Sequence, residues 1–174
     1  MIKQFKALGV SAPVVRALAA RAIHAPFAIQ QHVLPDALAG LDILAQSPTG
    51  SGKTLAFGIP LVERTEGASG KPAALVLVPT RELALQVADD LRPIAEAKRL
   101  RVATVYGGAS VGLQARAARA ATIVIATPGR MNDLLERRMI DERQSVVTRI
   151  AQSSTGPPTA IQPPNPSAID VTSV

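Results

Sequence analysis

The stretch Ala45-Gln46-Ser47-Pro48-Thr49-Gly50-Ser51-Gly52-Lys53-Thr54 decides the fold of this chain. A short aliphatic run, residues 42–46, leads into its glycines, and a helix-patterned segment follows them. Strand, glycine-rich turn and helix in this order are the setting of a phosphate-binding loop. Gly50 and Gly52 allow a tight turn whose successive N–H groups point at one anion, and the helix start adds its positive dipole end. The stretch therefore predicts a site for the phosphates of a nucleotide.

Two side chains of this stretch suit the chemistry of such a loop. Lys53 is placed to reach the β and γ phosphates, and the Thr54 hydroxyl to join the ligands of a Mg²⁺ ion. The general pattern G-x-x-x-x-G-K-[ST] requires glycine where Ser47 stands, so the match to it is imperfect. The alternative is an ordinary glycine-rich turn between a strand and a helix.

Aliphatic runs and helix-patterned segments alternate along the rest of the chain. We expect the strands to be residues 42–46, 73–78, 102–106 and 122–126. Each run is almost wholly apolar, which is typical of parallel strands covered on both faces. Helices are expected at residues 81–91, 113–121 and 131–139. This alternation predicts an α/β fold, doubly wound around a mostly parallel sheet.

Composition narrows the classes of protein further. The chain carries a net charge of +6, which favours a polyanionic partner, although many basic proteins only carry solvated arginines. It has no cysteine, which excludes disulfide scaffolds and thiolate metal sites. No apolar run is long enough to cross a membrane and no secretory signal is visible, so a cytoplasmic protein is expected.

The phosphate-loop variant A-x-x-x-T-G-S-G-K-T resembles motif I of the DEAD-box ATP-dependent RNA helicases. Other motifs of that family follow the same order. Pro26-Phe27-Ala28-Ile29-Gln30 resembles the Q motif, with Phe5 at the family's distance ahead of it, and Pro79-Thr80-Arg81-Glu82-Leu83-Ala84 resembles motif Ia. Gly107-Gly108 is similar to the GG motif, and Thr127-Pro128-Gly129-Arg130 to motif Ib. The resemblance implies a RecA-like domain that binds ATP with Mg²⁺, and RNA.

The resemblance also implies roles for individual residues. The Gln30 amide can pair with the N6 and N7 edge of adenine, and the Phe5 ring can stack on the base. Taken without the family, Phe5 is equally an anchor for an N-terminal helix and Gln30 a surface residue. The implied ATP-binding residues are Phe5, Gln30, Ser47, Pro48, Thr49, Gly50, Ser51, Gly52, Lys53 and Thr54, with Thr54 also the Mg²⁺ ligand.

The implied RNA-binding residues each follow the end of an expected strand, where ligands collect in open α/β sheets. They are Pro79, Thr80, Arg81, Glu82, Gly107, Gly108, Thr127, Pro128, Gly129 and Arg130. Arginines and exposed backbone suit contacts with phosphates, and none of these residues is suited to reading base edges. We therefore expect sequence-independent binding of RNA. The alternative, turns and a Thr80 helix cap, is compatible with that role.

The carboxylates that ATP hydrolysis requires are missing from the expected place. In the DEAD-box family the Asp-Glu-Ala-Asp motif supplies them from the end of an apolar strand. At the corresponding distance residues 150–154 read Ile-Ala-Gln-Ser-Ser, and the nearest pair, Asp141-Glu142, follows a helical pattern instead of a strand. We therefore identify no catalytic residue and expect impaired hydrolysis.

The resemblance ends near residue 142, and five of the 14 prolines lie in residues 151–174. We expect N-terminal flanking helices with the Q motif over residues 1–40, a partial RecA-like ATP-binding lobe over residues 41–142 and a divergent, disordered tail over residues 143–174. A frame-shifted, truncated product would explain this change. An incomplete sheet would expose edges and apolar helix faces, so marginal stability is expected.

Three functions follow from these patterns. The first is the ATP- and RNA-binding N-terminal lobe of a DEAD-box helicase, truncated and impaired in hydrolysis. The second is a non-enzymatic ATP- or RNA-binding fragment that competes with a full-length helicase. The third, another P-loop nucleotide-binding protein, explains none of the motifs around Gln30, Arg81 and Arg130.

Overall fold

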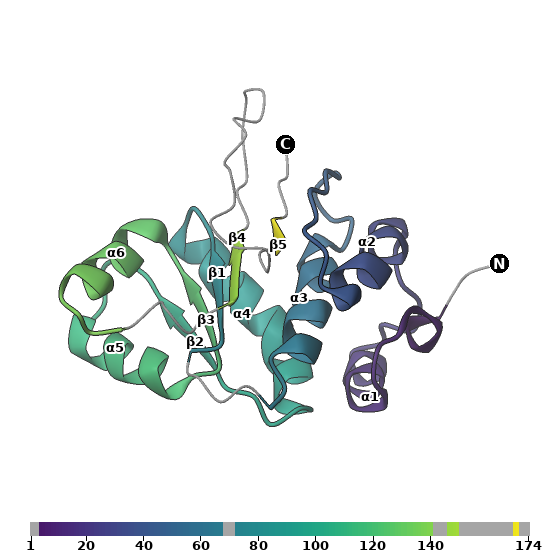
Figure 1. Cartoon of the computed structure of the whole chain (residues 1–174), viewed down its shortest axis with the longest axis horizontal. Coiled ribbons are helices and arrows are strands. Elements are labelled where there is room, and N and C mark those ends of the chain that lie inside the picture. Colours follow the sequence, from purple (N-terminus) through teal and green to yellow (C-terminus); the bar gives the residue numbers. More distant parts are fainter. Residues whose placement is uncertain (1–3, 68–71, 141–145, 150–168, 171–174) are drawn as a thin grey trace.

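The computed structural model describes residues 4–67, 72–140, 146–149 and 169–170 (Figure 1). The helices are the 3-10 helix η1 and six α-helices, with bounds η1 Phe5–Leu8, α1 Ala12–Ala20, α2 Ala28–Ala39, α3 Lys53–Arg64, α4 Arg81–Glu96, α5 Val111–Ala120 and α6 Pro128–Glu136. The strands are β1 Ala74–Leu77, β2 Val102–Val105, β3 Ile123–Ala126, β4 Val146–Arg149 and β5 Ile169–Asp170.

The strands form one sheet in the order β2-β3-β1-β4-β5, and every pairing is parallel. The register of β1 against β3 sets Ala74 beside Ile123 and Leu77 beside Ala126. All four residues of β3 are buried, as expected for a strand between two neighbours and two layers of helices. The α/β fold with a parallel sheet, predicted from the apolar runs, is confirmed.

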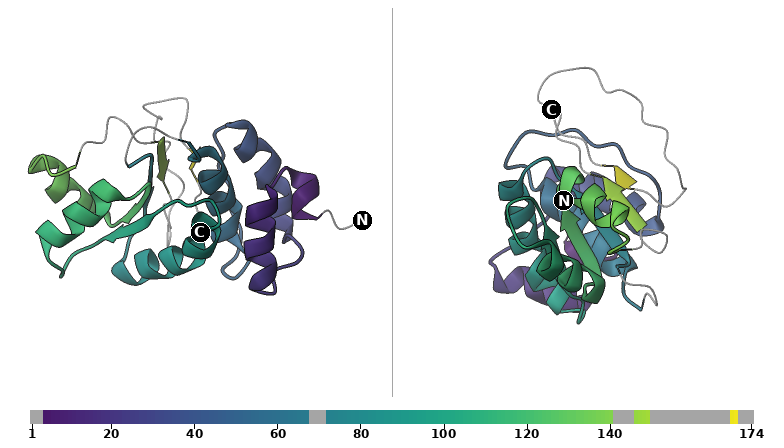
Figure 2. Two further views of the ribbon diagram at one scale, coloured as in Figure 1. Left: turned by 90° about the horizontal axis from the view of Figure 1, so that it is seen from below. Right: turned by 90° about the vertical axis from the view of Figure 1, so that its left-hand side faces the viewer.

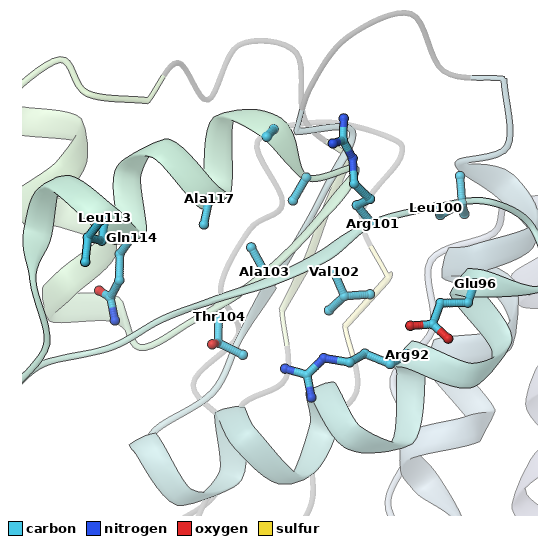
Figure 3. A pocket seen from close by; sticks show the side chains of 12 residues that line it. Arg92, Glu96, Leu100, Arg101, Val102, Ala103, Thr104, Leu113, Gln114 and Ala117 are labelled. Atoms are coloured by element: carbon cyan, nitrogen blue, oxygen red, sulfur yellow. The ribbon is translucent and has the colours of Figure 1, made fainter.

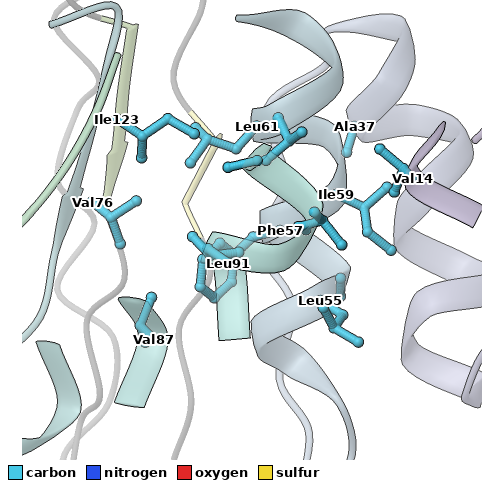
Figure 4. Packing of buried hydrophobic residues seen from close by; sticks show 14 of the residues in the cluster. Val14, Ala37, Leu55, Phe57, Ile59, Leu61, Val76, Val87, Leu91 and Ile123 are labelled. Carbon is cyan, nitrogen blue, oxygen red and sulfur yellow. The ribbon is translucent and has the colours of Figure 1, made fainter. Parts of the chain in front are cut away.

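Two buried clusters lie on opposite faces of the sheet. Val76 and Ile123 face the larger cluster, which α3 and α4 complete, as Figure 4 shows. Leu75 and Val124 face the smaller cluster, where α5 and α6 supply Ala118 and other small or aliphatic residues. Figure 2 shows the same arrangement from two further directions, with the helices on both sides of the strands. The core is almost wholly aliphatic, because the chain has so few aromatic residues.

The N-terminal helices are joined to this lobe by polar contacts. Glu63, near the end of α3, accepts a hydrogen bond of 2.8 Å from the Ser11 N–H at the start of α1 and lies 2.6 Å from the Lys98 ammonium. Lys98 also contacts Glu66, at 2.5 Å. Burial lowers the pKa of Lys98, but its bonds to the two carboxylates outweigh that effect, and the pKa is raised overall. The ion pairs thereby keep a nearly buried lysine charged.

One expected strand is wrong. Residues 41–48 have no regular secondary structure, although residues 42–46 read as an aliphatic run. Leu41 and Leu44 are 56% and 68% exposed, while Ala45 is buried. Within the described part of the chain, this segment has no strand partner, so its apolar residues lack the double coverage on which the prediction depended.

The opposite error concerns the C-terminal segment. No strand was expected after residue 142, yet β4 lies beside β1 and pairs Ala74 with Val146, and β5 pairs with β4. The adjacent β-branched pair Val146-Val147 gives the short strand its propensity. Apart from these two strands, the disorder expected for residues 143–174 concerns residues outside the described ranges. No helix in the described ranges is long and apolar enough to span a bilayer.

Candidate nucleotide site and adjoining sheet edge

The glycine-rich loop leads directly into α3, which begins at Lys53. Gly50 and Gly52 both have left-handed backbone conformations, with φ of +76° and +85°, which favour glycine. The Ser51 N–H donates to the Pro48 carbonyl at 3.4 Å, and the hydroxyls of Ser47 and Ser51 lie 2.5 Å apart. The loop therefore curls in front of a helix N-terminus, whose first N–H groups have no partner within the helix.

Lys53 folds back into this curl. Its ammonium donates to the carbonyls of Ser47 and Pro48, at 2.5 and 2.8 Å. Burial lowers the pKa of Lys53 because the charged form loses water. A partly buried cation inside a ring of backbone groups is an appropriate partner for a polyphosphate, which would supply stronger acceptors than two neutral carbonyls. Thr54 follows in the first turn of α3. These residues fit the phosphates of a nucleotide and its Mg²⁺ ion.

Gln30 connects the start of α2 to the loop. The side chain is 1% exposed, its Oε1 accepts from the Phe27 N–H at 3.0 Å, and its Nε2 donates to the Gly52 carbonyl at 2.9 Å. Oε1 retains a second acceptor site and Nε2 a second hydrogen. The structure thus brings together Gln30 and the loop, which are 22 residues apart in the sequence. Because the side chain is fully buried, a ligand reaches the remaining hydrogen and lone pair of the amide only after the loop or Phe27 has moved aside.

The two phenylalanines near this site differ in exposure, and only Phe27 lies at the surface beside the loop. Phe5 is 2% exposed and belongs to the larger core cluster, so it is the helix anchor and its ring is not presented for stacking on a base. Phe27 is 59% exposed and lies against the loop, because a Cβ added to Gly52 would come within 2.5 Å of its ring. The sequence analysis did not predict that Phe27 lies against the loop. The signal that could have indicated it was the position of Phe27 three residues before Gln30.

A second group of expected residues lies at the carboxyl ends of β1, β3 and β2. The guanidinium of Arg81 lies 4.8 Å from the centre of the Tyr106 ring, in cation–π contact, and close to Gly108. Thr80 caps α4 by accepting from the Leu83 N–H at 3.2 Å. Pro79, Glu82, Gly107, Pro128 and Gly129 are exposed, and Thr127 is half-buried. The segments around Arg81 and Gly108 thus lie close together at this edge of the sheet.

Arg130 has a more structural position than the sequence suggested. Its side chain is 13% exposed, and Nη1 donates to the Ala109 carbonyl and to Gln114 Oε1, both at 2.9 Å. Gln114 Oε1 also accepts from the Tyr106 N–H at 3.3 Å. Arg130 and Gln114 therefore hold the turn that contains Gly107 and Gly108. Gln114 was not predicted, because nothing in an Ala/Arg-rich helix distinguishes one buried glutamine.

The described part of the chain offers no cluster of three or more acidic or histidine side chains for a metal ion. Asp141 and Glu142 lie outside that part. The hydroxyl of Thr54, the Mg²⁺ ligand that the resemblance implies, lies within the described ranges.

Comparison with known proteins identifies relatives for this arrangement. The family model "DEAD/DEAH box helicase" matches residues 27–149. The RNA helicase CrhR of Synechocystis is 44% identical over 137 residues, which are 78% of this chain and 28% of that protein. The crystal structure of a DEAD box protein from Methanococcus jannaschii matches 88% of this chain and 42% of its own, with a TM-score of 0.80 and 35% identity. The RNA helicase Prp28 from Chaetomium thermophilum, solved with ADP, matches 85% of this chain and 38% of its own, with a TM-score of 0.77 and 33% identity. The chain thus spans less than a third of the curated relative and less than half of each solved structure.

Proposed function

The chain belongs to the DEAD/DEAH box helicase family, and from that premise we propose that it is the N-terminal, ATP- and RNA-binding lobe of a DEAD-box RNA helicase. The observation that carries the proposal is the bridge from Gln30 to the Gly52 carbonyl. It couples a base-reading amide to the loop that holds phosphates, as a site selective for one nucleotide requires.

ATP would occupy both halves of this site. The N–H groups at the start of α3 and the Lys53 ammonium would bind the β and γ phosphates once Lys53 leaves its two carbonyl partners. The free hydrogen and lone pair of the Gln30 amide suit the N6 and N7 edge of adenine. The exposed Phe27 ring, beside the same loop, offers an apolar surface to the base. Magnesium, when bound, would neutralise phosphate charge, and the Thr54 hydroxyl would be one of its ligands.

RNA would bind where β1, β2 and β3 end. Arg81 is exposed there and held by Tyr106, so its charge is available to a phosphate at little cost in side-chain order. Gly107 and Gly108 allow a nucleic-acid backbone to approach the main chain. Arg130 would act mainly by holding this turn, because its guanidinium already donates to Ala109 and Gln114.

We propose further that these 174 residues bind ATP without hydrolysing it. Hydrolysis on a phosphate loop needs a carboxylate for the Mg²⁺ shell and another to orient the attacking water. The sequence contains no Asp-Glu-Ala-Asp motif, and the Asp-Glu pair nearest to the expected position of that motif is Asp141-Glu142. The absence of this motif also supports the second candidate, a non-enzymatic fragment that competes with a complete helicase for ATP or RNA. RNA-stimulated phosphate release above the background would contradict both binding without hydrolysis and the competing fragment.

Competition between ATP and GTP for a fluorescent ATP analogue tests the nucleotide site. We expect ATP to displace the analogue, and Gln30→Ala to lower the preference for ATP over GTP by about tenfold, because the amide is lost. Gln86→Ala, which removes an exposed glutamine of α4, is the matched control. Equal affinity for ATP and GTP in the unmodified chain would refute the role of Gln30.

A further inference from the structure

The strand β2 is an open edge of the sheet. In the described part of the chain it pairs with β3 alone. The carbonyls of Arg101 and Val105 accept bonds from the β3 side, at Thr122, Ile123 and Thr127. Because alternate residues of a parallel strand point their N–H and C=O groups to opposite neighbours, those of Val102 and Thr104 point outward. The edge therefore presents two donors and two acceptors to a further strand.

A groove runs along this edge between α4 and α5 (Figure 3). Its volume is about 660 Å³. On the α5 side the wall is mostly apolar, with Ala117, Ala120 and Leu113, which is 71% exposed, and it includes the polar Gln114. An extended segment laid along β2 would gain backbone hydrogen bonds and cover this apolar wall, which is the chemistry of recognition by β-strand addition.

The charged side chains that line the groove indicate which kind of peptide segment it can bind. Figure 3 shows Arg101 and Arg92 on opposite sides of β2, with Val102 between them. Arg92 is paired with Asp89 at 2.5 Å and Glu96 lies on the same α4 side, so that side is nearly balanced. Arg101 is exposed and has no ion pair among the described residues. The α5 side is therefore mostly apolar with one unneutralised positive charge.

We propose that this groove, formed by β2, α4 and α5, binds an extended acidic segment of a partner protein as an added strand. A carboxylate of the segment would face Arg101, and an apolar residue on the same face of the added strand would cover Leu113 and Ala117.

Two other occupants fit less well. A second copy paired through the same edge would bring a second unpaired Arg101 into the groove, a positive charge where the first Arg101 needs a carboxylate. Single-stranded RNA would meet the exposed Leu113 and a lining without any aromatic side chain on which a base could stack. Both are outcomes that the experiment distinguishes.

Nitrogen-15 NMR of the whole chain tests the proposal by titration with the blocked octapeptide Glu-Thr-Glu-Thr-Val-Thr-Val-Thr, which as an extended strand carries its glutamates and valines on one face. The comparison peptide has lysine in place of both glutamates. We expect saturable shifts at Val102, Thr104, Leu113 and Gln114, and none with the lysine peptide. Arg101→Glu should weaken binding about tenfold or more, whereas Arg116→Glu, the same charge change on the exposed surface of α5, should leave binding unchanged.

Two further variants separate lost binding from lost folding. Val102→Pro removes an outward N–H while leaving the bonds to β3 in place, as proline at a sheet edge allows, and should abolish the shifts. Leu113→Asp replaces an exposed side chain and should weaken binding in a folded chain. An absence of shifts at millimolar peptide would overturn the proposal, as would equal binding of the lysine peptide or unchanged peptide binding by the Arg101→Glu variant. Displacement of the peptide by RNA would show that RNA occupies the groove. Shifts at β2 that depend on protein concentration without peptide would show that a second copy occupies it.

Discussion

Individual glycines decide whether the phosphate loop can form. Gly50 and Gly52 have similar left-handed φ angles but different surroundings. A Cβ on Gly50 would meet nothing within 4 Å, whereas a Cβ on Gly52 would come within 2.5 Å of both Gln30 Nε2 and the Phe27 ring. The first glycine is needed for backbone conformation alone, and the second is also needed for the contact that joins base and phosphate subsites.

Alanine substitution at these two positions separates the effects. Gly50→Ala should cost about 1–2 kcal/mol in strain. Gly52→Ala should carry a similar strain and also displace Gln30, so we expect it to weaken binding of ATP about tenfold more than Gly50→Ala does. Equilibrium titration with a fluorescent ATP analogue measures both affinities. Equal losses in the two variants would show that the Gln30 contact contributes nothing to binding.

The sequence predicted which residues form the site better than it predicted how they are used. The loop, Gln30 and Arg81 lie where their motifs implied. Exposure could not be predicted, because nothing local distinguishes Phe5, which fills the core, from Phe27, which lies on the loop. Hydrogen-bond partners that are distant in the sequence could not be predicted either. Arg130 was expected to face RNA, but its guanidinium donates to the Ala109 carbonyl and to Gln114.

At the scale of elements, the close crossing of α3 and α4 supports the site. Gly58 lies in the middle of α3, and a Cβ there would stand 2.1 Å from Leu91 Cδ2 in α4. At this point Leu91 packs directly against the backbone of α3, because glycine has no side chain to hold it away. Because α3 carries Lys53 at its first residue, the crossing fixes the helix whose start forms the phosphate site.

Gly58→Ala should destabilise the chain by about 1–3 kcal/mol, since an overpacked crossing has to separate. Gly112→Ala is the matched control in α5, where an added Cβ meets nothing within 4 Å. That change should be neutral or stabilising, by less than about 1 kcal/mol, because alanine favours helix. Chemical denaturation followed by circular dichroism measures both, and an unchanged midpoint for Gly58→Ala would contradict the crossing.

Regular elements were predictable where the apolar pattern is long and both faces are covered. The strands β1, β2 and β3 match their aliphatic runs, and α4 extends beyond the expected residues because Pro93 is tolerated near its end. Residues 42–46 satisfied the pattern but lack a partner strand in the described part of the chain, and β4 has a partner although its pattern is weak. Strand pairing is a tertiary property, which a local pattern does not contain.

At the scale of the whole molecule, β4 removes one reason to expect low stability. The sequence predicts marginal stability because loss of an interior strand would expose unpaired edges and apolar helix faces. In the structure Val146–Arg149 pairs with β1 along its whole length. Marginal stability remains a prediction to be measured, but an unpaired β1 is no longer an argument for low stability.

The net charge of +6 and the exposed Arg81 at the carboxyl end of β1 predict salt-dependent binding of single-stranded RNA. Arg81→Ala should weaken binding at every RNA sequence and reduce the slope of log affinity against log salt by about one counterion. Arg16→Ala, an exposed arginine of α1, is the control for net charge. Fluorescence anisotropy across a salt series measures the slope. Identical slopes for the two variants would argue against a specific contact at Arg81.

The central claim is that the loop from Ser47 to Thr54 binds the phosphates of ATP. Isothermal titration calorimetry of the chain with Mg-ATP, repeated with Lys53→Ala and with the exposed-lysine control Lys6→Ala, tests it most directly. We predict a saturable, single-site heat for the unmodified chain and for Lys6→Ala, and none for Lys53→Ala. No heat with the unmodified chain, or the same isotherm with Lys53→Ala, would contradict the account.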